Sequence, residues 1–270
     1  MNAESDLPAL LAEATKAAES AGAHLKQQYA QLPTFPEFRE WDQLRTKFYE
    51  LDALTSKIVM EPLQAVHPDA QWLEEDWEHG TVIPTEGDVW VLDAVEGAVQ
   101  FVHHLPGWVV SLALVRDGET VLSILHSPLL NETYTAIRGG GAFLNGEPIT
   151  PSPKTALSAA MVATGEAPFI GRQPEIAKQI ARGYLRLMPA AMAHRNFGPT
   201  AWEIADVASG RLDVFWQFGK DPANLLAGAL LVTEAGGTVT DAKGNPWQAD
   251  SESFIAGPAV LTEQVVAALA

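Results

Sequence analysis

The stretch VWVLDAVEG (Val89–Gly97) decides the fold. Its four apolar residues predict a short strand. Asp93 follows at the end of that strand, Glu96 comes three residues later, and Gly97 turns the chain toward a helix. Carboxylate oxygens bind divalent cations, and backbone N–H groups at a helix start point toward an anion. The motif therefore predicts a metal and phosphate site, although an acidic surface loop has the same pattern.

The segments around this motif predict two helices and a group of strands. Apolar residues recur at three- and four-residue steps from Leu7 to Tyr29, as in an amphipathic helix. A second such pattern runs from Leu51 to Leu63, where Pro62 is expected to kink or stop the helix. Short runs rich in β-branched and aromatic residues predict an antiparallel meander. These runs are Val89–Leu92, Val109–Val115, Thr120–Leu125 and Glu132–Ile137.

Strands and helices alternate after PSPK (Pro151–Lys154). Strands are predicted near residues 160–164, 212–216, 238–240 and 254–256, and helices near 175–187, 200–208, 224–235 and 259–269. This order predicts an α/β arrangement with a sheet covered by helices on both faces. PSPK is the one convincing boundary, so we expect closely packed halves at 1–150 and 151–270. Two independent domains would need a longer linker.

The composition is that of an ordinary globular protein. Of 270 residues, 47% are apolar and 19% charged, which excludes a disordered, collagen-like or coiled-coil chain. Seventeen basic residues against 34 acidic ones give a net charge of −17, which repels nucleic-acid backbones and anionic lipid. We therefore expect neither nucleic acid nor a membrane surface as a partner. The surplus of carboxylates favours solubility, and divalent metal sites are also built from carboxylates.

The chain contains no cysteine, which excludes disulfides, zinc–thiolate sites, iron–sulfur clusters and cysteine nucleophiles. The first twenty residues lack the order of a signal peptide, and no apolar run approaches the ~18 residues of a membrane helix. We therefore expect a cytoplasmic protein. No serine stands in a nucleophile elbow, so a serine hydrolase is not expected.

Two further segments carry chemistry. Glu74-Glu75-Asp76 lies in an expected loop before the first strand, and Asn224–Gly237 reads as a helix ending in a Gly-Gly cap. With the first motif, both resemble the inositol monophosphatase family of lithium-sensitive, magnesium-dependent phosphatases in order and spacing. The resemblance covers about residues 50 to 240. It rests on LEED (Leu73–Asp76), DAVEGAVQFVHHLPGW (Asp93–Trp108), AIRGGGAFLNG (Ala136–Gly146), FGPTAWEIADVASGRLDVFW (Phe197–Trp216) and PANLLAGALLVTEAGG (Pro222–Gly237).

The resemblance implies a layered α-β-α-β-α sandwich, α+β in the N-terminal half and α/β in the C-terminal half, with the site between the halves and a homodimer. It also implies hydrolysis of a small polyol, sugar or nucleotide phosphate by a metal-activated water, with Mg²⁺, or alternatively Mn²⁺, as cofactor. By position, Glu75 and Asp52 are the catalytic acids, and Gly97, Ala98 and Gln217 contact the substrate. The implied metal ligands are Glu75, Asp93, the Val95 carbonyl, Glu96 and Asn224.

Several of these positions depart from the family pattern. Ala98 replaces a water-orienting threonine, Asn224 replaces an aspartate that binds the second metal, Glu96 is one methylene longer than aspartate, and Gln217 stands where glutamate is frequent. We expect an intact first metal site and a weak second one, because Mg²⁺ prefers anionic oxygens. Asp221 is an alternative source of the lost charge. A second hypothesis is a catalytically impaired relative that binds a phosphorylated ligand or a protein partner.

Overall fold

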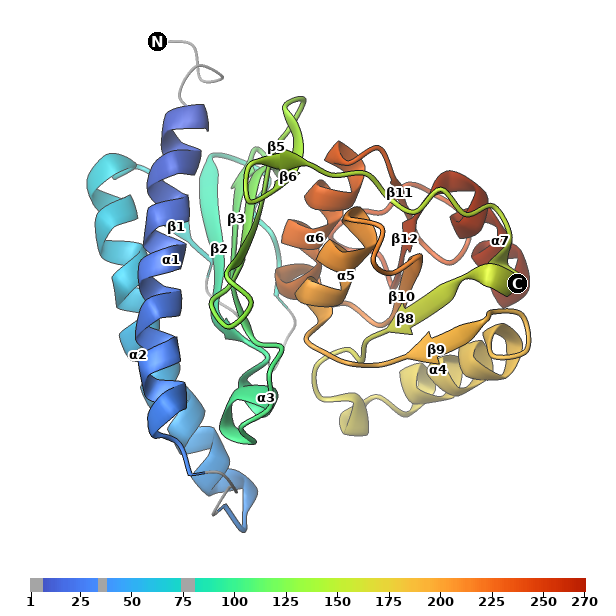
Figure 1. Cartoon of the computed structure of the whole chain (residues 1–270), viewed down its shortest axis with the longest axis horizontal. Coiled ribbons are helices and arrows are strands. Elements are labelled where there is room, and N and C mark those ends of the chain that lie inside the picture. Colours follow the sequence, from blue (N-terminus) through green and yellow to red (C-terminus); the bar gives the residue numbers. More distant parts are fainter. Residues whose placement is uncertain (1–6, 34–37, 74–80) are drawn as a thin grey trace.

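The computed structural model of the chain describes residues 7–33, 38–73 and 81–270. These residues form five layers, in which helix pairs alternate with two β-sheets (Figure 1). The strands of the first sheet all precede residue 149, and those of the second all follow residue 160. The layered α/β sandwich expected from the sequence is confirmed.

The first half consists of two long helices against a seven-stranded sheet. Helix α1 (Leu7–Gln31) agrees with its predicted pattern, and α2 (Trp41–Val66) runs past Pro62, where a kink or stop was predicted. Val59 and Leu63 beside the proline are fully buried, so packing offsets the lost backbone hydrogen bond. The sheet has the order β1-β2-β3-β4-β5-β6-β7, and only β1 pairs in parallel, so the predicted meander is confirmed. Its strands are β1 (Gln71–Trp72), β2 (Asp88–Glu96), β3 (Val109–Arg116), β4 (Glu119–Ser127), β5 (Glu132–Ile137), β6 (Gly141–Leu144) and β7 (Glu147–Pro148), and the short helix α3 (Ala98–Val102) follows β2.

The second half has a five-stranded sheet of order β11-β12-β10-β8-β9 with helices on both faces, as predicted. Strand β10 pairs in parallel with β8 and antiparallel with β12. The strands are β8 (Met161–Thr164), β9 (Ala193–Arg195), β10 (Val214–Phe218), β11 (Thr238–Thr240) and β12 (Ser253–Gly257). The helices are α4 (Pro174–Leu187), α5 (Thr200–Ala208), α6 (Pro222–Glu234) and α7 (Ala259–Leu269), with 3₁₀ turns η1 (Leu157–Ala159) and η2 (Ile170–Arg172).

Three apolar cores hold the layers together. Helices α1 and α2 cover the outer face of the first sheet, α5 and α6 fill the space between the sheets, and α4 and α7 cover the outer face of the second sheet (Figure 1). The central helices pack closely, because a Cβ added to Gly228 on α6 would lie 2.6 Å from Cγ2 of Ile204 on α5. Helix α6 runs through this central layer, so its first turn is held firmly relative to both sheets.

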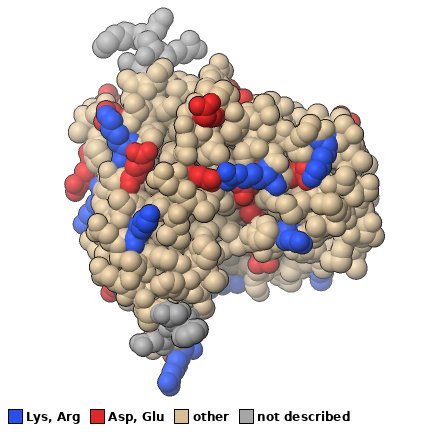
Figure 2. All heavy atoms as spheres, in the orientation of Figure 1, with Lys and Arg blue, Asp and Glu red and all other residues tan. Residues whose placement is uncertain are grey.

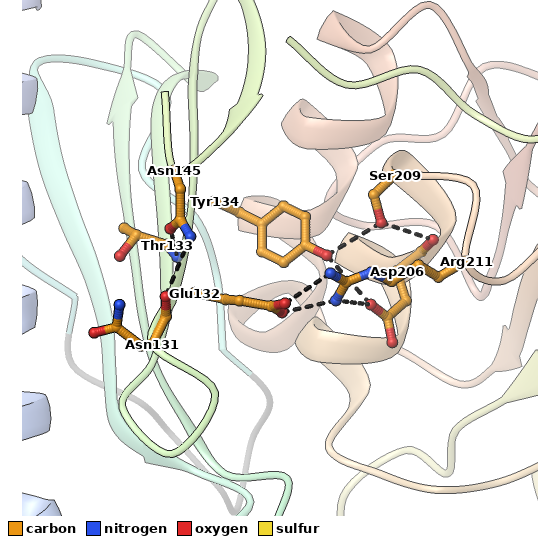
Figure 3. A network of polar contacts seen from close by, with 8 residues as sticks. All are labelled: Asn131, Glu132, Thr133, Tyr134, Asn145, Asp206, Ser209 and Arg211. Atoms are coloured by element: carbon orange, nitrogen blue, oxygen red, sulfur yellow. Dashed lines mark hydrogen bonds and ion pairs between the residues drawn. The ribbon is translucent and has the colours of Figure 1, made fainter. Parts of the chain in front are cut away.

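Polar contacts also join the halves (Figure 3). Arg211, after α5, donates to both carboxylate oxygens of Glu132 on β5 at 2.7 Å. The hydroxyl of Tyr134 on β5 donates to Oδ1 of Asp206 at 3.2 Å. On the face seen in Figure 2, acidic and basic side chains of the described residues are interspersed. None of the described helices is long and apolar enough to cross a membrane.

Candidate active site

A pocket of about 770 Å³ opens between the two halves. One wall comes from the first half, from the end of β2 through the Gly97 turn to α3, with α2 beside it. The other wall comes from the second half, from the segment before α5 and the first turn of α6. Segments more than 100 residues apart in the chain therefore meet in one cavity.

The first wall is built on an irregularity in β2. The register between β2 and β3 shifts between Asp93 and Glu96, so the strand bulges where the two acids stand. Asp93 Oδ1 accepts the Val95 N–H at 2.9 Å, and Glu96 Oε1 accepts the Ala201 N–H of the other half at 3.1 Å. Gly97 has φ of 90°, and an added Cβ would lie 3.1 Å from the Gly107 carbonyl oxygen, so glycine is required at this turn.

The carboxyls of this wall are buried, and burial resists their ionisation. Burial raises the pKa of Asp93 well above its usual value, and repulsion from Glu96 adds to the effect. Burial and the charge of Asp221 raise the pKa of Glu96, hydrogen bonds with Ala201 and Asp93 oppose them, and the net result is a pKa of about 7. Burial also raises the pKa of Asp52, which a hydrogen bond with Ser56 opposes. A cation placed among these carboxyls would offset the cost of their burial and their mutual repulsion, so the wall favours the approach of a cation.

The second wall centres on Asp221, the residue that precedes α6. Gln217 Nε2, at the end of β10, donates to Oδ2 of Asp221 at 3.0 Å. Asn224 Nδ2, in the first turn of α6, donates to Oδ1 at 2.9 Å. Asp221 is 5% exposed and lines the pocket. The carboxylate therefore has one amide donor on each of its oxygens.

The structure brings most of the predicted site residues to this pocket, and their roles stay predictions. Asp52, Asp93, Val95, Glu96, Gly97, Ala98 and Asn224 all line it. Gln217 is buried and contacts Asp221. Glu75 lies outside the described residues. Sequence reasoning missed Gln100, Glu166 and Thr200, which also line the pocket. Gln100 and Thr200 lie within quoted motifs but were not singled out there, and Glu166 lies in none of them.

The donors of the pocket suit a divalent cation by their chemistry. Five acids line it (Asp52, Asp93, Glu96, Glu166 and Asp221), and none of the described lining residues is basic. Hard, anionic oxygens are the ligands of Mg²⁺ and Mn²⁺. Within residues 7–33, 38–73 and 81–270, no group of three or more acids or histidines is already arranged around an ion position. The described carboxyls therefore fit a cation in kind, and part of the expected set, Glu75, lies outside them.

Comparison with known proteins gives a consistent result. The model of the inositol monophosphatase family matches residues 6–270. An inositol monophosphatase of Dictyostelium discoideum is 34% identical over 209 residues, covering 77% of this chain and 76% of that protein. The Nus factor SuhB of Escherichia coli is 32% identical over 238 residues, covering 86% and 84% of the two chains. The structure of inositol monophosphatase from Anabaena (Nostoc) superposes with a TM-score of 0.83 at 25% identity, covering 98% of this chain and 96% of that one.

Proposed function

The chain belongs to the inositol monophosphatase family, and from this we propose that it is a metal-dependent phosphomonoesterase acting on a small polyol, sugar or nucleotide phosphate. The observation that carries the proposal is the charge of the pocket. Five acids and no described basic residue line it, so an anionic phosphate ester would be repelled unless cations entered with it. Its volume of about 770 Å³ suits a small molecule.

The proposed roles follow the two walls. Glu75, Asp93 and the Val95 carbonyl would hold the first cation, and Glu96 and Asn224 would hold a second, weaker one between the two walls. When bound, Mg²⁺ or Mn²⁺ would stabilise the developing charge on the phosphoryl oxygens and lower the pKa of a water molecule.

The remaining groups bind and orient the substrate. The amides of Gly97 and Ala98 would donate to the phosphate at the turn into α3, and Asp52 would accept a proton from the attacking water. Gln217 has its amide N–H on Asp221, so we assign it to the support of this wall in addition to any substrate contact. A cytoplasmic homodimer, as the family resemblance implies, belongs to the same proposal, and sedimentation would test the dimer.

A screen of phosphate esters with Mg²⁺ and with Mn²⁺ tests this function. Asp93→Asn is the blank, because it removes a pocket carboxylate with little change of shape. Asp250→Asn is the matched control, since Asp250 is exposed and does not line the pocket. We expect hydrolysis by the parent and the control, lost by about 10³-fold in the blank. Hydrolysis no faster in the parent than in Asp93→Asn would contradict the proposal.

The second candidate is a binding protein without catalysis. Ala98 and Asn224 favour it, because both replace groups that the family pattern uses in hydrolysis. One relative is named as a Nus factor, a name that does not refer to hydrolysis. An inactive parent that still binds a phosphate ester or a protein partner would leave this candidate standing.

A further inference from the structure

We propose that Gln100 is a positioning residue, which holds residues 196–199 of the second half against α3 and so closes the pocket around the leaving group of the ester. The inference rests on the proposed phosphatase function. It deepens that function, because the acids of the pocket concern the phosphate and its cations, whereas Gln100 acts on the rest of the substrate.

The first argument is placement. Residues 196–199 connect β9 to α5, and three of them, Asn196, Gly198 and Pro199, line the pocket. Gln100 belongs to α3 in the opposite wall and lines the same pocket. The 196–199 segment and α3 therefore form two sides of one cavity, and the distance between them limits what the cavity can hold.

The second argument is how Phe197, inside this segment, is held. Its N–H donates to Oε1 of Glu203 on α5 at 2.7 Å, and its carbonyl oxygen accepts from Nε2 of Gln100 at 3.3 Å. The Phe197 side chain is 57% exposed, so packing of the ring fixes its place only weakly. The Glu203 bond ties the segment to its own half, and the Gln100 bond joins it to the other half.

The third argument is the contact that continues on the C-terminal side of Phe197. A Cβ added to Gly97 would lie 3.1 Å from Cγ of Pro199, and the Ala201 N–H donates to Oε1 of Glu96 at 3.1 Å. The end of the segment therefore stays against the first wall without the Gln100 bond. Loss of that bond would release the start of the segment from α3, and the fold would be retained.

The fourth argument comes from Gly198. Its φ is 53°, in the left-handed region that favours glycine, and a Cβ added there would overlap the Gln100 amide nitrogen. Apart from its chain neighbours, the described atoms within 4 Å of that Cβ all belong to Gln100. A side chain at 198 would therefore push the Gln100 amide away from the Phe197 carbonyl, which gives a second way to break the same bond.

The test separates binding of the leaving group from binding of the phosphate. Gln100→Met keeps the length of the side chain and removes the amide donor. With the ester that is hydrolysed fastest in the screen, we expect KM to rise by about fivefold, because one hydrogen bond is lost, and kcat to stay within about twofold of the parent. The inhibition constant of inorganic phosphate should stay at the parent value, because phosphate has no leaving group. A role in folding alone would not raise one constant and spare the other.

A double-mutant cycle tests the geometry of the bond. Gly198→Ala in the parent should raise KM about as much as Gln100→Met does. The same change in a Gln100→Ala background should raise KM by less than about twofold further, because the added methyl group then meets no amide. The backbone cost of alanine at this φ is the same in both backgrounds and cancels.

Gln27→Met is the matched control, because Gln27 is exposed on α1 and does not line the pocket. It should match the parent, and melting temperatures identify any variant that does not fold. The inference is overturned if folded Gln100→Met keeps the parent KM, if its loss lies in kcat alone, or if the phosphate constant rises as much as KM does. It is also overturned if folded Gly198→Ala costs the same in both backgrounds. Where Gly198→Ala does not fold, Gln100→Met decides.

Failure of the proposed activity gives a different result. If the parent hydrolyses no ester, the proposed activity fails, and calorimetry with Mn²⁺ gives the dissociation constants of glycerol 2-phosphate and of inorganic phosphate in place of the kinetic constants. Gln100→Met should then weaken binding of glycerol 2-phosphate by about fivefold and leave binding of phosphate unchanged. The same affinity for glycerol 2-phosphate in the variant and the parent, or a parent that binds phosphate and not this ester, would overturn the inference. A parent that binds neither would overturn the inference together with the proposed function.

Discussion

The two walls of the pocket differ in how their acids are held. In the first wall, Asp93 and Glu96 stand on a bulge of β2, and backbone N–H groups of Val95 and Ala201 hold their carboxylates. In the second wall, Asp221 stands before α6, and the side-chain amides of Gln217 and Asn224 donate to its carboxylate. The first wall keeps acids at both positions of the family pattern. The second wall has neither of the acids expected at 217 and 224, and carries one at 221 instead.

This difference indicates in which wall an acidic residue can shift to another sequence position when the sequence changes. A β-bulge fixes one backbone path, so a displaced acid would point to another face of the sheet. At a helix start, residues three apart are neighbours, so a carboxylate and an amide can exchange places with no change of backbone. We therefore expect the second wall to be the adaptable part of this site.

The first prediction concerns Glu203, which supports the second wall. It is 1% exposed, and its Oε1 accepts the Phe197 N–H at 2.7 Å, next to the pocket. Burial raises the pKa of Glu203, backbone hydrogen bonds from Phe197 and Gly198 oppose the rise, the charge of Asp206 adds to it, and the net result is a pKa of about 7. The folded state holds the Glu203 proton more tightly than the unfolded chain does. The protonated side chain therefore contributes its full share to the free energy of unfolding below about pH 4.5, and this share is lost as pH rises through 7. The loss is about 3 kcal/mol.

Glu203→Gln should remove that slope and make the protein more stable than the parent at pH 8, with little difference at pH 4. Urea unfolding at several pH values measures it. Glu175→Gln, an exposed change on α4, is the control. A variant whose stability runs parallel to the parent from pH 4 to 8 would show that the second wall carries no strained charge.

The second prediction concerns His126, in the first half of the chain. Its effect on the pH dependence of stability has the opposite sign to that of Glu203. Burial lowers the pKa of His126 to about 4, while its Nδ1 lies 2.9 Å from the Thr133 hydroxyl. The unfolded chain takes up a proton near pH 6.5, so stability is full above that value and falls by about 3 kcal/mol as pH drops through 4. His126→Gln should lose this dependence in the same urea series. Equal slopes in the variant and the parent between pH 4 and 6.5 would contradict it.

Much of the fold could be predicted because its signals are local. The period of α1 and the turn-separated runs of the meander each lie within a short segment. The strand predicted from residue 212 begins only at Val214, and just before it the Asp213 carboxylate accepts the Met161 N–H at 2.6 Å and pairs with Lys154. The partners in these contacts lie 50 or more positions away in the sequence, so a local sequence pattern carries no information about them.

Residues of both walls could be named from the sequence, but the arrangement of side chains could be expected only for the first wall, for a related reason. Asp93, Glu96 and Gly97 are contiguous, so one motif places them together. The direction of the Asp221 side chain depends on donors four residues before and three residues after it, on a strand and a helix. Sequence identifies these residue types, and only the folded chain shows that both amides turn toward the same carboxylate.

The third prediction sharpens the comparison from the first wall. Ala98 is the first residue of α3 and lines the pocket, where the family pattern has threonine. Ala98→Thr should raise kcat by about 10-fold, because a hydroxyl there can orient the attacking water. Ala98→Val adds the same branched shape without the hydroxyl and should give no gain. Equal kcat values for the Thr and Val variants would show that this wall orients its water by another group, with Asp52 the first to test.

The last and smallest effect concerns the connection between the halves. The Arg211–Glu132 pair joins β5 to the turn after α5 with two hydrogen bonds (Figure 3), yet neither residue lines the pocket. Arg211 is partly exposed, so water weakens the pair, and Glu132→Gln should cost only about 1 kcal/mol of unfolding free energy. The bond from Tyr134 to Asp206 remains to hold the same elements. A double-mutant cycle with Arg211→Met in urea measures the coupling, while kcat/KM of each folded variant should stay at the parent value. A fall in kcat/KM without loss of stability would mean that this pair sets the spacing of the two walls. The second wall would then adapt by moving as a rigid body, and not by exchange of side chains at the start of α6.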